Sequence, residues 1–145
     1  MSLSEYTGII RITNLRLRTF IGFNPEERRK QQDVIVNIEI HHRAEDAALV
    51  DDDVTAALDY KAVTKAVINH VEQGRFLLLE KLVHDLVEIC RDHPAVTRSV
   101  VTVDKPHALR FADSVSLTLA WDAPQTQPKS EQANESYART FSKAS

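Results

Sequence analysis

A clear alternation of apolar and polar side chains runs through VIVNIEI, residues Val34–Ile40. The even-numbered positions are all valine or isoleucine, whereas Asn37 and Glu39 occupy odd-numbered ones. Because successive side chains of a strand point to opposite faces, the stretch predicts a strand with one buried face. It therefore predicts a sheet that packs on other elements with that face.

Three further segments show the same two-residue period. Apolar and charged residues alternate over Ile9–Arg18, and a turn follows at Gly22–Pro25. Val101 and Val103 alternate with polar neighbours, and the apolar residues of 115–121 share one face. The sequence thus predicts two strands in the first third of the chain and two in the last third.

The period changes to that of a helix between these strand pairs. Apolar residues recur at helical spacing from about Val54, Asp51–Asp53 stand ahead of them, and Gly74 ends the pattern. Acidic residues are favoured at a helix N-terminus and glycine just past its end. A second apolar stripe runs over Leu79–Cys90, with Pro94 beyond it. The order ββααββ predicts an α+β fold, in which a four-stranded antiparallel sheet packs on two helices.

Length and composition indicate one globular domain. The chain has 145 residues, of which 43% are hydrophobic and 27% charged. These values are typical of a domain with a core. We expect the domain to occupy residues 1–121. Residues 122–145 are rich in Gln, Ser, Pro and Ala and lack an apolar period, which predicts a disordered tail. The open edges of a four-stranded sheet favour a homo-oligomer.

Charge, cysteine usage and the start of the chain argue against several classes of protein. A net charge of −3 argues against a nucleic-acid partner. No apolar run approaches the ~20 residues that span a bilayer, so no membrane partner is expected. The first residues show no secretory signal, and a single cysteine, Cys90, permits no internal disulfide. The expected location is a reducing cytoplasm.

The sequence contains no recognisable metal or cofactor motif. Glycine-rich nucleotide loops and paired-histidine helix motifs are missing, and the six histidines are scattered. His41 and His42 face opposite sides of a strand. Cys90 lies on an apolar stripe, as a core thiol would, and Asp51–Asp53 are better explained as a solvated helix start than as a cation site. We expect no metal site and no cofactor.

Three side chains could carry chemistry, although each has a simpler structural interpretation. Glu80 is either a carboxylate favoured by the start of a helix or an anchor for a planar, guanidine-like ligand edge. Lys105 either marks a strand end or, if partly desolvated, serves as a general acid or base. Tyr60 lies off the apolar stripe of its helix and could be an ordinary interface aromatic. None of the three defines a function alone.

Four short motifs, taken in order, resemble those of the dihydroneopterin aldolase family. They are FIGFNPEE (Phe20–Glu27) with Gln32, LDY (Leu58–Tyr60), LLEKL (Leu78–Leu82) and DKP (Asp104–Pro106). The likeness spans roughly Ile9–Trp121. The flanking stretches NLRLRTFIG (Asn14–Gly22) and HALRFADSVS (His107–Ser116) are similar to an epimerising branch of this family.

The resemblance implies a tunnelling fold with four strands and two helices in each subunit. It also implies rings that stack as an octamer of two tetramers, with substrate sites between subunits. Glu80, together with Leu79, would hold the aminopyrimidinone edge of a pterin. Lys105 would help to protonate the ring, and Tyr60 would assist proton transfer from across the interface. Glu27 would position the substrate side chain or the Lys105 ammonium.

The reaction implied is epimerisation at C2′ of 7,8-dihydroneopterin triphosphate to the monapterin form, in tetrahydromonapterin biosynthesis. Retro-aldol cleavage would give an aldehyde, and re-addition to its opposite face would invert C2′. The reduced pterin ring is the electron sink, so no cofactor is implied. The alternative is the aldolase reaction of folate biosynthesis, which releases glycolaldehyde and 6-hydroxymethyl-7,8-dihydropterin.

A triphosphate would help to retain the cleaved fragment where cations are near. Six basic residues are candidates for this role, and for each of them a solvated surface charge is at least an equal alternative. They are Arg16, Arg18, Arg28, Arg29, Lys30 and Arg110.

Overall fold

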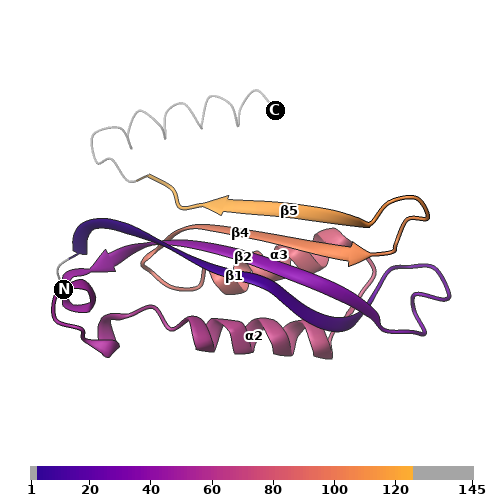
Figure 1. The fold of residues 1–145 in the computed structure, drawn as a ribbon, viewed down its shortest axis with the longest axis horizontal. Coiled ribbons are helices and arrows are strands. Elements are labelled where there is room, and N and C mark those ends of the chain that lie inside the picture. Colours follow the sequence, from indigo (N-terminus) through magenta and orange to yellow (C-terminus); the bar gives the residue numbers. More distant parts are fainter. Residues whose placement is uncertain (1–2, 126–145) are drawn as a thin grey trace, which may run out of the picture.

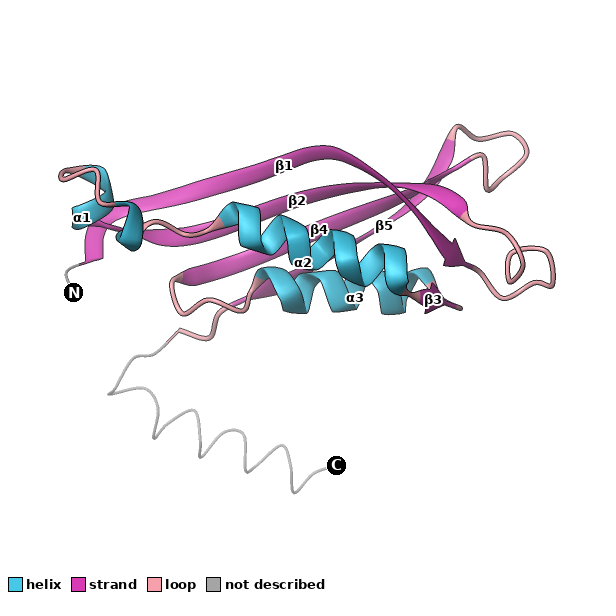
Figure 2. Ribbon diagram, turned by 90° about the horizontal axis from the view of Figure 1, so that it is seen from below, coloured by secondary structure: helices cyan, strands magenta, loops and turns pink. Residues whose placement is uncertain are grey.

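The computed structural model describes residues 3–125, in which one β-sheet is covered on one face by helices (Figure 1, Figure 2). The strands are β1 (Leu3–Ile21), β2 (Gln32–Glu45), β3 (Arg75–Phe76), β4 (Val96–Pro106) and β5 (Ser114–Asp122). The helices are α1 (Asp46–Leu49), the 3-10 turn η1 (Val54–Ala56), α2 (Tyr60–Gln73) and α3 (Leu79–Cys90). Within the described part of the chain, no helix is long and apolar enough to cross a membrane.

The sheet has the strand order β3-β1-β2-β4-β5. β1, β2, β4 and β5 pair antiparallel, and their register sets Val36 opposite Val103 and Val103 opposite Leu117. The alternation that predicted β2 is therefore confirmed, because Val34, Val36, Ile38 and Ile40 are all buried. The opposite face of β2 is only partly covered.

Helices α2 and α3 lie side by side on the buried face of the sheet (Figure 2). The second apolar stripe is confirmed, since its members from Leu82 to Cys90 pack into the core with β2 and β4. Helix α2 adds Val67 and Val71, both fully buried. Burial raises the pKa of the Cys90 thiol to about 12, as expected for a core cysteine.

The predicted count of four strands and two helices is wrong in two places. A fifth, two-residue strand, β3, lies between α2 and α3 along the chain and pairs parallel with Phe20 and Ile21 of β1. The short helix α1 follows β2 directly. Neither element is long enough to show a period in the sequence, and β3 depends on a tertiary partner. The sheet is consequently mixed rather than purely antiparallel.

The long helix also starts later than predicted. Asp53 caps only the 3-10 turn η1, where its side chain accepts a hydrogen bond from Thr55 N at 3.0 Å. Asp59 is the true N-cap of α2 and accepts from Ala62 N at 3.0 Å. Val54, which the helical pattern included, is 84% exposed. Tyr60 is thereby placed in the first turn of α2.

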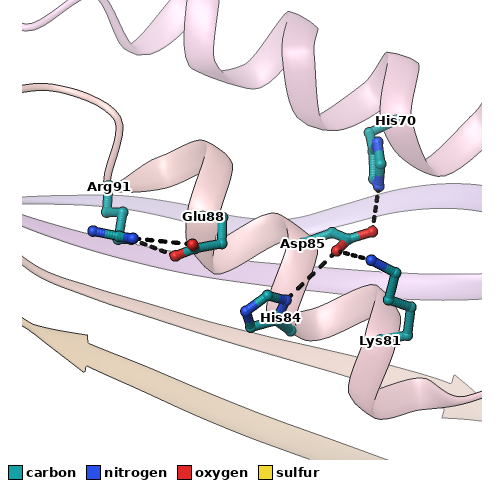
Figure 3. Close-up of polar contacts among 6 residues, drawn as sticks. All are labelled: His70, Lys81, His84, Asp85, Glu88 and Arg91. Atoms are coloured by element: carbon teal, nitrogen blue, oxygen red, sulfur yellow. Dashed lines mark hydrogen bonds and ion pairs between the residues drawn. The ribbon is translucent and has the colours of Figure 1, made fainter.

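A polar network joins α2 to α3 on the side away from the sheet (Figure 3). Asp85 Oδ2 lies 2.8 Å from His70 Nε2, and Asp85 Oδ1 accepts from Lys81 Nζ at 2.9 Å. His84 Nδ1 lies 3.6 Å from the same carboxylate. Burial alone would raise the pKa of Asp85, but the hydrogen bonds from Lys81 and His70 outweigh it, and the pKa is lowered. The network therefore favours the ionised carboxylate.

The predicted tail falls mostly outside the described residues, which end at 125. Strand β5 itself continues to Asp122, whose carboxylate accepts from Arg98 Nη1 at 2.7 Å.

Candidate active site

An ion pair joins the end of β4 to the loop between β1 and β2. Lys105 Nζ donates to Glu27 Oε2 at 3.0 Å, across 78 positions of sequence. The Lys105 side chain is 12% exposed and that of Glu27 is 24% exposed. Lys105 belongs to the same face of β4 as the buried Val101 and Val103, so its amine points toward the helix side of the sheet. The structure thus brings together two of the residues that the sequence singled out.

The loop of residues 22–31 presents the Glu27 carboxylate by means of local hydrogen bonds. Asn24 Oδ1 accepts from Glu27 N at 2.8 Å, which closes a turn. Gln32 Nε2 donates to Ile21 O at 2.6 Å and to Glu27 Oε2 at 3.3 Å. The sequence motif contains Gln32 but predicts no role for it, although its position at the start of β2, directly after the loop, is a signal for a contact with that loop.

Gly22 makes room for this carboxylate. Its φ of 128° lies in a region that residues with a side chain rarely adopt, and a Cβ placed there would overlap with the Glu27 carboxyl group. Gly22 N also donates to Phe76 O at 2.9 Å, so the loop is tied to β3. The glycine is therefore required by the backbone, and a side chain at this position would force the Glu27 carboxyl group to move.

The surroundings of Glu27 favour its charged form. Partial burial by itself would raise the pKa of Glu27. The hydrogen bonds from Lys105 and Gln32, together with the positive charge of Lys105, outweigh that effect and lower the pKa. At neutral pH the site accordingly holds a carboxylate facing an ammonium group, which can orient a substrate hydroxyl or move a proton between nearby atoms.

Glu80 and Leu79 lie at the same end of the molecule. They begin α3, which follows β3, and β3 is bonded to Gly22. Glu80 is exposed in the first turn of α3, and no contact pairs it with another described residue. The carboxylate is consequently free to accept paired hydrogen bonds from a planar ligand edge.

Tyr60 lies at the opposite end of the molecule. It is 51% exposed and borders a hollow of about 620 Å³ with Leu58, Arg43 and Ala95. Ala95 immediately precedes β4, whereas Lys105 is near the end of that strand. At about 3.3 Å per strand residue, these two ends are on the order of 30 Å apart. Within one chain, the structure does not bring Tyr60 to Lys105.

Within residues 3–125, no group of three or more His, Cys, Asp or Glu side chains could hold a metal ion.

The sequence matches a known protein family. The family model for dihydroneopterin aldolase matches residues 10–120, and the chain belongs to that family. The dihydroneopterin triphosphate 2′-epimerase of Escherichia coli K12 is 52% identical over 119 residues, covering 82% of this chain and 98% of the relative. The enzyme of the same name from Pseudomonas aeruginosa is 51% identical, covering 77% of this chain and 89% of the relative.

A solved structure agrees with the fold. Escherichia coli dihydroneopterin aldolase in complex with neopterin has a TM-score of 0.72 and 27% sequence identity. The match covers 79% of this chain and 98% of that chain.

Proposed function

We propose that this protein is a dihydroneopterin triphosphate 2′-epimerase. The observation that carries the proposal is the contact between Lys105 and Glu27, at the end of the sheet where the first turn of α3 presents Glu80. Relatives at 51% and 52% identity with that activity in their names support it. The reaction inverts C2′ of 7,8-dihydroneopterin triphosphate and gives the monapterin epimer.

The reaction proceeds through cleavage of the C1′–C2′ bond. The C2′ hydroxyl loses its proton, C2′ becomes the aldehyde carbon of the departing fragment, and the electron pair of the bond passes into the pterin ring. Lys105 assists protonation of the ring nitrogen, and Glu27 orients the side chain and the ammonium group. Glu80, with Leu79, holds the aminopyrimidinone edge. Re-addition to the opposite face of the aldehyde re-forms the bond with C2′ inverted.

The complete site is formed by more than one copy of the chain. Among the described residues, nothing pairs with the outer edge of β5, and β3 covers only the last two residues of β1. Two such edges can pair β1 of one copy with β5 of the next. Closed rings, stacked as two tetramers, would bring Tyr60 of one copy to Lys105 of another, where it assists proton transfer. Size-exclusion chromatography with light scattering tests the octamer.

The proposed activity is tested with the purified full chain and dihydroneopterin triphosphate. Chromatography of the dephosphorylated products should show the monapterin epimer rising to equilibrium with neopterin. Unchanged substrate after long incubation would rule out this function.

The alternative activity is that of a dihydroneopterin aldolase. The 27% identical structure bound to neopterin favours pterin binding at this site. Epimerase and aldolase share the cleaved intermediate and differ in the fate of the aldehyde. Efficient release of glycolaldehyde from unphosphorylated dihydroneopterin, with little epimer from the triphosphate, would identify the aldolase. We place either reaction in the cytoplasm, which is compatible with the free thiol of Cys90.

A further inference from the structure

Two loops at the active-site end of the sheet carry arginines that the mechanism does not use. Arg28 and Arg29 lie in the loop of residues 22–31, and Arg110 lies in the loop of residues 107–113. Both loops extend from the same end of the sheet in the two views (Figure 1, Figure 2). Arg28 and Arg29 directly follow Glu27, and Arg110 is five positions after Lys105. The two loops that bear these arginines therefore leave the sheet at the end where the ion pair lies.

These arginines have no carboxylate partner within residues 3–125, although their neighbours do. Glu26 is paired with Lys30 at 3.8 Å, and Glu27 with Lys105 at 3.0 Å. Arg28, Arg29 and Arg110 are all exposed. The guanidinium carbon of Arg110 lies 5.3 Å from the centroid of the Phe111 ring. The positive charge at this end of the molecule is thus left free for an anionic ligand, although the chain as a whole is negative.

Each of the two loops is held by a hydrogen bond to its backbone. Arg75 Nη1 donates to Arg28 O at 3.2 Å, while its guanidinium carbon lies 3.8 Å from the centroid of the Phe20 ring. On the other loop, His107 N donates to Asp113 O at 3.1 Å, which closes the segment that bears Arg110. Held loops lower the entropic cost of ordering a charged ligand between them.

The remaining arginine candidates, Arg16 and Arg18, lie on the face of the sheet that points away from the helices. Arg16 pairs in register with Ile35 and Arg18 with Asp33, on the side of the sheet opposite to the buried Val34. Lys105 is on the helix side. Arg18 is moreover occupied, because its guanidinium lies 3.5 Å from Asp33 and donates to Gln31 O at 3.1 Å. Neither residue shares the helix-side face with Lys105.

Resting on the proposed function, we propose that Arg28, Arg29 and Arg110 bind the triphosphate of the substrate. We call this set the arginine rim. A guanidinium group gives two parallel hydrogen bonds to a phosphate and remains charged at all working pH values, so the rim suits a polyphosphate better than a hydroxyl group. After cleavage, the triphosphate stays on the aldehyde fragment. The arginine rim then holds that fragment beside the pterin until the bond re-forms, which favours epimerisation over release.

The test compares two substrates in the full-length protein. The variants are Arg110→Gln and the double variant Arg28→Gln with Arg29→Gln, and Lys65→Gln on the outer side of α2 is the matched control. Removing a charge-assisted contact should raise KM for the triphosphate by about tenfold or more and lower its kcat/KM relative to unphosphorylated dihydroneopterin. Released aldehyde should increase at the expense of epimer. Equal losses on both substrates, or an unchanged ratio of epimer to aldehyde, would overturn the arginine rim.

A second measurement separates this inference from the proposed function. Inorganic tripolyphosphate should bind the wild-type protein in calorimetry, and both arginine variants should bind it at least about tenfold more weakly than Lys65→Gln does. Equal binding by all variants would refute the arginine rim even if the wild type is an active epimerase. Conversely, a wild type that binds tripolyphosphate through these arginines but forms no epimer would refute only the proposed function.

Discussion

Lys105 and Glu27 form an ion pair of 3.0 Å between the end of β4 and the β1–β2 loop, and both side chains are mostly buried. Gln32 contacts the same Glu27 oxygen at 3.3 Å, so that this oxygen is held from two directions. A carboxylate and an ammonium group held in this way are already oriented when the substrate binds, so the reaction does not bear the entropic cost of bringing them together.

Replacing Lys105 with alanine should remove turnover while leaving the assembly intact. The amine is the proposed proton donor, and loss of a general acid typically costs about 10²–10⁴-fold in rate. We expect kcat to fall in this range, with an unchanged elution volume and retained pterin binding by fluorescence. Lys65→Ala, which removes an exposed lysine of α2, is the control and should keep wild-type kinetics. Turnover that survives Lys105→Ala would exclude the proposed role.

Replacing Gly22 with alanine should disturb the site from within the loop. A Cβ would overlap with the Glu27 carboxyl group, and the φ of 128° is strained for alanine. A strained backbone position of this kind costs about 1–3 kcal/mol. We expect a lower melting temperature together with a loss of activity larger than that of Glu27→Gln at equal folded fraction. Gly8→Ala serves for comparison, since its Cβ would meet His42 at the far end of β1. Wild-type activity in Gly22→Ala would contradict the required approach of Glu27.

The lowered pKa of Glu27 predicts how activity depends on pH. The pKa of Glu27 is lower in the folded state than its ordinary value of 4.5. The ionised carboxylate therefore stabilises the folded state at pH values above 4.5, and this contribution is lost as the pH falls through the pKa of the folded state. Glu27 should therefore remain ionised at pH 5. Glu27→Gln should reduce kcat/KM by the same factor at pH 5 and pH 7. An acid limb above pH 5 that is present in the wild type and missing in Glu27→Gln would argue against this assignment.

Asp85→Asn should weaken the contact between α2 and α3 shown in Figure 3. The wild-type carboxylate contacts His70, Lys81 and His84, and a hydrogen bond to a charged group contributes about 1.5–3 kcal/mol to stability. The pKa of Asp85 is lowered from 3.8, so its contribution is present above that pH and is lost as the pH falls through the folded value. Urea unfolding at pH 7 should show the variant to be less stable, and the difference should shrink toward pH 3. Asp51→Asn, on the surface, should have no such effect.

The sequence predicted those parts of the fold that repeat along the chain. In β2 every second side chain is buried, which gives the alternation, and in α3 every third or fourth side chain is buried, which gives the apolar stripe. Both patterns can be read from the sequence of the element itself, without knowing what it packs against. Strand β3 could not be predicted, because two residues show no period and become a strand only beside Phe20 and Ile21. The start of α2 was misplaced because Asp51–Asp53 resemble a helix start as closely as Asp59 does.

The residues by themselves predicted the candidate site only as separate groups, and the family resemblance implied that Glu27 positions the Lys105 ammonium. Glu27 and Lys105 are 78 positions apart, and their contact depends on how the β1–β2 loop folds back over the end of β4. The hydrogen bond to Asn24 in that loop and the contact of Gln32 at the start of β2 are local details, and no periodic pattern encodes them. Tyr60 could not be placed, since its proposed partners belong to another copy of the chain.

The distance between Tyr60 and Lys105 has a genetic consequence. If neighbouring copies share each site, a chain without Lys105 inactivates one of the two sites to which it contributes. A chain without Tyr60 inactivates the other of its two sites. Rings that mix the two inactive variants would then contain some sites in which one copy supplies Lys105 and another supplies Tyr60. Co-expression of Tyr60→Phe and Lys105→Ala should thus restore part of the activity that each lacks alone, whereas either variant mixed with the wild type should lower the activity only in proportion to its share of the chains.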